Sequence, residues 1–196
     1  GEICGVVATS RDITDLQLAQ EMLRHQANQE RAVNNMIKLM QPFEMESTLP
    51  LALKDISLLL EAAHGAIARY EAEIQSWLHI AEHRVNDSLP TCLGLPLLDA
   101  ENPVADTLKQ GQVICIDDST ALTDQTHRQL AKLFPGAWLV VPLQINGRLW
   151  GSLTLKKLKP TWPPEAVGLS LRIAHQFAIG IHQSELLQAA QAAFQK

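Results

Sequence analysis

A single dipeptide, Asn146-Gly147, constrains the fold of this chain more than any other feature of its sequence. It stands in a short break between two apolar runs, residues 138–143 and 148–155. Asn and Gly both tolerate the positive φ angles that the turn of a tight β-hairpin requires. We therefore predict a hairpin here, as part of an antiparallel β-sheet.

The rest of the chain alternates between helical and strand-like patterns. Residues 42–50, bounded by Pro42 and Pro50, are expected to form a break, after which the globular part begins. Beyond it we predict a helix over 51–63, strands over 65–70 and 77–83, a short helix over 104–108, a strand over 112–116, a helix over 125–134, the hairpin, and a final helix that opens at residues 163–165. This order is typical of an α+β fold with an antiparallel sheet.

The first 41 residues have a different character. Residues 1–10 alternate like one strand, and a lone strand needs a sheet outside itself to pair with. Asp12 and Thr14 can then cap a helix that continues to residue 41 without Gly or Pro. Its narrow apolar stripe predicts a dimer-forming linker helix and comprises Leu16, Leu23, Val33, Ile37 and Met40. We expect the chain to be a fragment of a larger protein.

Composition restricts the function further. A net charge of −5 and 46% hydrophobic residues are typical of a soluble globular domain, and no apolar run approaches the roughly 18 residues of a membrane span. The cysteines, Cys4, Cys92 and Cys115, are odd in number and form no CxxC pair, which favours a reducing, cytoplasmic setting. The basic cluster at 156–159 is expected to be a solvated strand end. We therefore expect no nucleic-acid partner and no membrane partner.

One motif bears on metal binding. Residues 79–83 match H-x-x-E-H, in which two His ligands and a Glu base must share one face of a helix. The stretch predicts a strand instead, in which His79 and His83 would point one way and Glu82 the other. We therefore expect no metal site, and a metalloenzyme built on these residues is an alternative hypothesis.

Two stretches resemble known families. Residues 5–14, ending in Asp12-Ile13-Thr14, look like the last strand and exit motif of a PAS domain. Residues 52–185 resemble a GAF domain, through the segments 111–117, 138–143 and 146–153. The resemblance implies an antiparallel sheet with helices on one face, a cup for a small molecule, and long helices at both ends. It divides the chain into a PAS end (1–14), a linker signalling helix (15–46), a GAF domain (47–185) and the start of an outgoing signalling helix (186–196).

The GAF-like part is similar to the phytochrome and cyanobacteriochrome branch in residues 149–151, 174–176 and 181–186. Bilin-binding members attach a tetrapyrrole through a Cys that precedes a His, and Thr126-His127 stand at this position in the present chain. Some members carry a second attachment Cys upstream, and Glu101 stands at that position here. A threonine hydroxyl is a far weaker nucleophile than a thiolate. The resemblance therefore implies no covalent bilin and no cofactor, with Cys92 as an alternative attachment residue and non-covalent binding left open. The candidate ligand-binding residues are His127, Thr126, Tyr70 and Trp138.

A PAS domain, a helix, a GAF domain and a second helix, in this order, usually precede a histidine kinase transmitter domain. The resemblance thus implies a regulatory sensory or signal-relay module of a two-component sensor histidine kinase, without catalysis of its own and with the kinase output domain in the same full-length chain. The final helix is expected to pair in a homodimer through Phe177, Ile181 and Leu187. Alternatives are a ligand-free interaction platform whose own side chains fill the cup, and an input domain for a diguanylate-cyclase-type output.

Overall fold

The computed structural model describes residues 15–24, 26–28, 30–31, 45–123, 128, 131–158 and 161–194. The chain divides into two compact units, residues 1–35 and 36–196. In the first unit, residues 15–24, 26–28 and 30–31 are α-helical, as predicted for the linker helix, and Leu16 and Leu23 are exposed. The predicted PAS end (1–14) and the stripe residues Val33, Ile37 and Met40 lie outside the described residues.

The second unit contains one antiparallel sheet of six strands, in the order β3-β2-β1-β6-β5-β4. The strands are β1 (His64–Glu71), β2 (Ser76–Arg84), β3 (Pro96–Leu98), β4 (Ile114–Ile116), β5 (Ala137–Ile145) and β6 (Arg148–Lys157). Because β1 and β6 are paired in the middle, the sheet joins the β1–β2 hairpin to the β5–β6 hairpin, through strands whose paired residues are more than 80 positions apart in the sequence. Together with the helices, this arrangement confirms the predicted α+β class.

The hairpin predicted from Asn146-Gly147 is the connection between β5 and β6. Asn146 has a φ of 51° and Gly147 a φ of 75°, both in the left-handed region. A two-residue loop with positive φ at both positions matches the right-handed twist of the flanking strands. The local chemistry of two residues therefore sets the register between β5 and β6.

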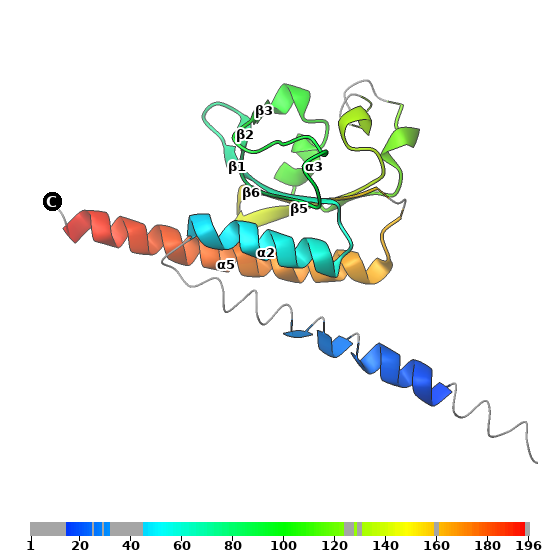
Figure 1. Cartoon of the computed structure of the whole chain (residues 1–196). Helices are drawn as coiled ribbons and strands as arrows, with labels where there is room; N and C mark the ends of the chain where they lie inside the picture. Colours follow the sequence, from blue (N-terminus) through cyan, green and yellow to red (C-terminus); the bar gives the residue numbers. More distant parts are fainter. Residues whose placement is uncertain are drawn as a thin grey trace, which may run out of the picture. The chain divides into compact units, whose positions relative to one another are not determined.

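The two long helices, α2 (Met45–Leu59) and α5 (Pro164–Phe194), pack on one face of the sheet (Figure 1). They enclose the main core with inward residues of the strands, and its fully buried members include Leu53, Ile56, Leu139, Ile173 and Phe177. The opposite face carries the loops, the short helix α3 (Ala105–Lys109), and the 3-10 turns η1 (Asp99–Glu101) and η2 (Ser119–Ala121). A second apolar cluster forms there, around Trp77 and Leu108.

The predicted break over 42–50 is wrong in its second half, because α2 begins at Met45 and includes Pro50. Pro50 is the sixth residue of this helix, so its missing N–H removes only one hydrogen bond near the N-terminal end. The apolar face runs through this position, since Leu49 and Ala52 are both buried. Burial of that face outweighs the local preference of proline for a break. Half of the predicted helix over 125–134 lies outside the described residues; of the described half, residues 128 and 131–133 are helical, as predicted.

A β-bulge in β2 changes which face of the sheet its residues reach. Ile67 pairs with Ala81 and Ala68 with His79, so Ile80 is left as an extra residue. An extra residue shifts the side-chain alternation by one position. Residues on the two sides of Ile80 therefore do not follow the simple period of two along this strand.

Candidate functional site

A cavity of about 230 Å³ lies between the sheet and the loops on the face opposite α2 and α5. The sheet side of its lining comes from β1, β2, β3, β5 and β6, and the other side from residues 90–92, 95, 102–104, 108 and 133–134. The lining is mainly apolar, with a few polar groups, and includes Trp77, Leu97, Val104, Leu108, Phe134, Trp138, Val140, His79, Cys92, Ser152, Thr154 and Lys156. A mainly apolar cavity with a few polar groups is the usual form of a small-molecule site.

Lys156 gives this cavity one cationic group. Its Nζ lies 3.6 Å from the centre of the Phe134 ring and 5.6 Å from that of Trp138. Burial lowers the pKa of Lys156 to about 8. Among the described residues, no carboxylate lies within ion-pair distance of this amine. An anionic group on a bound molecule would therefore be attracted to this end of the cavity.

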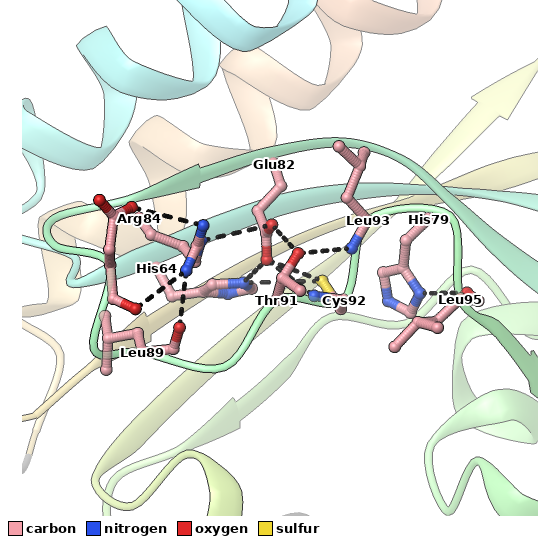
Figure 2. Close-up of polar contacts among 10 residues, drawn as sticks. His64, His79, Glu82, Arg84, Leu89, Thr91, Cys92, Leu93 and Leu95 are labelled. Atoms are coloured by element: carbon pink, nitrogen blue, oxygen red, sulfur yellow. Dashed lines mark hydrogen bonds and ion pairs between the residues drawn. The ribbon is translucent and has the colours of Figure 1, made fainter.

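One wall of the cavity is held by Glu82, whose carboxylate collects hydrogen bonds from the loop after β2 (Figure 2). Its Oε2 accepts a hydrogen bond of 2.6 Å from the Thr91 hydroxyl, and its Oε1 accepts one of 2.9 Å from the Cys92 backbone N–H. Oε1 also lies 2.8 Å from Nε2 of His64 and 3.4 Å from Sγ of Cys92. Arg84 holds the same loop through the carbonyl of Leu89, at 2.8 Å. The loop is thus fixed to the sheet by side chains of β1 and β2.

The protonation states of this cluster follow from its burial and its hydrogen bonds. Burial, together with the charge of Lys156, lowers the pKa of His64 to about 4, so its ring is neutral at neutral pH. Burial alone would raise the pKa of Glu82, but hydrogen bonds from Thr91, Cys92 and His64 lower it to about 2. Burial and the Glu82 charge raise the pKa of the Cys92 thiol to about 12. At neutral pH the cluster therefore holds one carboxylate, a neutral imidazole and a thiol.

The prediction that His79 and His83 share one face of the strand, opposite Glu82, is wrong because of the bulge at Ile80. His79 lines the cavity, and its Nδ1 lies 3.0 Å from the Leu95 carbonyl oxygen. Glu82 reaches the same side of the sheet, where it contacts His64. His83 pairs with Gly65, at a position that faces Leu53 and Ser57 of α2. The sheet therefore separates His83 from the other two, and the H-x-x-E-H motif does not assemble.

Comparisons with known proteins bear on the family. Residues 44–181 match the GAF domain family. The chain belongs to this family. A crystal structure of the phycoerythrobilin-bound GAF domain from a cyanobacterial phytochrome is similar to it, with a TM-score of 0.71 and 22% identity over 82% of this chain and 97% of that one. The GAF domain from an Acinetobacter phosphoenolpyruvate-protein phosphotransferase is also similar, with a TM-score of 0.65 and 14% identity over 81% of this chain and 95% of that one.

A curated relative extends the likeness beyond the GAF domain. The circadian input-output histidine kinase CikA of Thermosynechococcus vestitus is 26% identical over 191 residues, which cover 86% of this chain. The chain spans only 24% of the length of that kinase. Among the described residues, no helix is both long enough and apolar enough to cross a membrane.

The predicted ligand-binding residues of the GAF domain take different positions. Trp138 lines the cavity, and its Nε1 donates to the Phe134 carbonyl oxygen at 2.7 Å. Tyr70 is not among the described lining residues and donates to Asp99 at 3.0 Å instead. Thr126 and His127 lie outside the described residues. A ligand-binding role for these residues stays a prediction.

Asp99 and Glu101, in the stretch compared with the second attachment motif, lie in the 3-10 turn η1. Asp99 accepts hydrogen bonds from Tyr70 and from Trp77, at 2.7 Å for the latter, and pairs with Lys109. Although burial alone would raise the pKa of Asp99, these bonds lower it. The side chain thus ties η1 to β1, β2 and α3. Glu101 is exposed and is not among the described lining residues.

Two of the predicted dimer residues of the final helix are buried within their own GAF domain. Phe177 and Ile181 are 0% and 2% exposed, on the face of α5 that packs on the sheet. They therefore contribute to the core, and another helix could reach them only if α5 left the sheet. Leu187, beyond the last buried residue of the helix, is partly exposed. Exposed apolar side chains of α5 are instead Leu171, Ile179, Leu186 and Phe194.

Sequence reasoning missed the His64–Glu82–Cys92 cluster. Its members are separated by 18 and 10 residues along the chain, a spacing that matches no helical or turn motif. His64 reaches Glu82 because β1 and β2 pair, and Cys92 reaches both because the following loop folds back over the sheet. The sequence had singled out Glu82, in a motif that does not assemble, and Cys92, as an alternative attachment residue, but it did not bring the two together or point to His64.

Proposed function

We propose that this GAF domain is the regulatory sensory or signal-relay module of a two-component sensor histidine kinase. The observation that carries the proposal is the similarity to a histidine kinase over 86% of the chain, a larger share than the GAF match over residues 44–181 covers. The module itself has no catalytic role in this proposal. The kinase output domain would belong to the same full-length protein.

The geometry provides a route from the cavity to the outgoing helix. Val140 of β5 lines the cavity, and its neighbours Leu139 and Val141, which point to the opposite face, are fully buried. That face of β5 packs against α5. Because interiors are close-packed, a ligand that displaces Val140 would also displace the strand and the helix behind it. The last buried residue of α5 is Ser184, and its described residues beyond that point project from the domain core.

The described cavity argues against the alternative of a cup filled by its own side chains. A volume of about 230 Å³ bounded by Trp77, Val140 and Lys156 can hold a small molecule. A platform that only pairs with other proteins has no need for such a space. The cavity therefore supports a domain that senses a ligand over a ligand-free interaction platform.

Two properties of the described residues support the proposal that no bilin is bound covalently. Cys92 is the one described cysteine that lines the cavity, and burial raises its pKa to about 12, which keeps the thiol protonated and a poor nucleophile. The cavity, as the described residues bound it, is also smaller than the roughly 300–1,000 Å³ of pockets that take drug-sized ligands, and a tetrapyrrole is at least of that size. We propose that the domain senses a smaller molecule.

Expression of the chain with a bilin supply tests this point. We expect the denatured protein to keep its unmodified mass, with no visible absorption that stays with the polypeptide. A Cys92→Ser variant should give the same result as the unaltered chain. A covalent adduct that is lost in Cys92→Ser would show that Cys92 is an attachment residue and would refute the proposal.

We further propose that the module forms a homodimer through the exposed face of α5. Leu171, Ile179 and Leu186 are each at least 40% exposed and follow one another at spacings of eight and seven residues. Apolar side chains seven or eight residues apart lie on one face of a helix, and such a face can pair with a second helix. These residues replace Phe177 and Ile181 as the expected dimer contacts, because the latter two are buried.

The double substitution Leu171→Glu/Ile179→Glu should convert the dimer into a monomer, because it places two carboxylates in an apolar seam. Sedimentation velocity at increasing protein concentration measures the change. Ile74→Glu is the matched control, since Ile74 is equally apolar and 62% exposed but lies in the turn between β1 and β2. A dimer that survives the double substitution, or an unaltered chain that sediments as a monomer, would rule out this interface.

A further inference from the structure

The side chains of His64, Glu82 and Cys92 lie in contact with one another, Cys92 also lines the cavity, and together they suggest a chemistry that goes beyond the proposed relay function (Figure 2). We propose that these three side chains form a binding site for a divalent metal ion of the zinc type. The ligand atoms are His64 Nε2, a carboxylate oxygen of Glu82 and Cys92 Sγ, which all lie within 4.8 Å of one another. One imidazole, one carboxylate and one thiolate are all common zinc ligands.

The separations of these atoms are close to the edges of a zinc tetrahedron. Zinc–ligand distances of about 2.3 Å for sulfur and about 2.0–2.1 Å for nitrogen or oxygen give tetrahedral edges of about 3.5–3.6 Å to the sulfur. Sγ of Cys92 lies 3.6 Å from Nε2 of His64 and 3.4 Å from Oε1 of Glu82. The hydrogen bond between His64 and Glu82, at 2.8 Å, must open by roughly half an ångström to admit the ion. A rotation of one side chain would be sufficient.

The charges of the cluster leave a single proton to be displaced. With pKa values of about 4 for His64 and about 2 for Glu82, the imidazole is neutral and the carboxylate ionised at neutral pH, as metal ligation requires. The Cys92 thiol must lose its proton, and the Nε2 proton that His64 donates to Glu82 must move to Nδ1, a buried atom without a hydrogen-bond partner among the described residues. The S–H bond breaks, the S–Zn bond forms with the electron pair of the sulfur, and one proton leaves to solvent. No electron is transferred, so the step needs no oxidant or reductant.

Neighbouring groups act on the site in opposite directions. Thr91 Oγ1 and the Cys92 backbone N–H donate to Glu82 and hold its carboxylate in place, which is the usual task of the outer partners of a metal ligand. The cations of Lys156 and Arg84 oppose a further positive charge; the guanidinium of Arg84 lies 3.5 Å from Glu82 Oε2. Cys92 also lines the cavity, so the ion would border the space available to a ligand.

Cobalt(II) substitution tests the proposal directly. The full 196-residue chain with Cys4→Ser and Cys115→Ser retains Cys92 as its sole thiol, so a thiolate-to-cobalt absorption band can arise only from Cys92. We expect one Co²⁺ per chain with this band, displacement of Co²⁺ by Zn²⁺, and release of about one proton on Zn²⁺ binding. Calorimetry in two buffers of different ionisation enthalpy measures the proton.

Variants of each ligand complete the test. Cys92→Ser should abolish the thiolate-to-cobalt band. His64→Gln or Glu82→Gln should weaken Zn²⁺ binding at least about 100-fold, because the loss of a residue that only hydrogen-bonds to a metal ligand costs about 10–100-fold. His83→Gln is the control, because His83 lies on the other face of the same strand. Lys156→Met, which removes the nearby cation, should tighten Zn²⁺ binding. Circular dichroism establishes that each variant is folded.

Three results would overturn the proposal. They are bound Co²⁺ without a thiolate band, Zn²⁺ affinity that is unchanged in both His64→Gln and Glu82→Gln, and no Zn²⁺ binding by the folded parent chain. If a ligand variant does not fold, the parent chain alone decides, through its cobalt band and its proton release. Dimerisation and bilin attachment are measured separately, so a failure of the metal site leaves the relay function standing.

Discussion

Substitution of Phe177 by alanine is expected to lower the free energy of unfolding by about 3–5 kcal/mol, the usual cost of deleting a fully buried aromatic side chain. Phe177 is 0% exposed and lies on the face of α5 that packs on the sheet. Its removal leaves a cavity that the neighbouring strands can fill only in part. Urea-induced unfolding, followed by circular dichroism and tryptophan fluorescence, measures the loss.

Leu58→Ala, on the exposed face of α2, is the matched control. Leu58 is 62% exposed, so its truncation should change the free energy of unfolding by no more than about 0.5 kcal/mol. A small loss for Phe177→Ala would mean that α5 does not pack on the sheet in solution. The comparison therefore tests the contact through which the cavity would act on the outgoing helix.

Local chemistry was sufficient to predict the sheet hairpin and the fold class. Asn146-Gly147 specifies its turn without reference to the rest of the chain, and the proline pair at the start of α5 specifies a helix start in the same way. Strands β1 and β2 followed from their apolar content, and their bounds differ from the predicted ones by a single residue. These features depend on neighbours in the sequence, which is why a single sequence was enough.

The orientation of Glu82 could not be predicted because it depends on tertiary structure. The period of two that applies to a regular strand is interrupted by the extra residue Ile80, and no Gly or Pro marks the bulge. The resulting shift brings Glu82 to the side of His79 and leaves His83 facing α2. One inserted residue thus determines which histidine can meet the carboxylate.

The same limit applies to the final helix. The apolar spacing of α5 is compatible with both a core face and a pairing face, and the sequence does not distinguish them. Only the position of the sheet shows that Phe177 and Ile181 are buried while Ile179 and Leu186 are exposed. The expected dimer contacts consequently move to another side of the same helix.

Substitution of Glu82 by alanine, in protein freed of metal by a chelator, should also lower the free energy of unfolding by about 3–5 kcal/mol, because buried hydrogen-bond donors lose their acceptor. The Glu82 side chain is 6% exposed. Its loss leaves the Cys92 N–H, the Thr91 hydroxyl and the His64 ring without their acceptor. Each buried donor left without a partner costs about 1–3 kcal/mol, so the loop after β2 should detach from the sheet. Chelator-treated parent and variant are compared by urea-induced unfolding.

Glu71→Ala provides the control. It removes a carboxylate from the neighbouring strand β1, and the ion pair that this carboxylate forms with Arg69, at 2.8 Å, is exposed. An exposed pair contributes only about 0–1 kcal/mol. Equal losses for the two variants would show that the hydrogen bonds of Glu82 do not hold the loop.

The pH dependence of the Glu82→Ala effect provides a second check. Glu82 has a pKa of about 2 in the folded chain against an ordinary value of 4.5, so the unfolded chain binds more protons between these values. The stabilisation by Glu82 is therefore complete above 4.5 and is lost as the pH falls towards 2. The difference between the parent chain and Glu82→Ala should accordingly shrink over this window. A difference that stays constant on acidification would mean that the ionised carboxylate is not what holds the loop to the sheet.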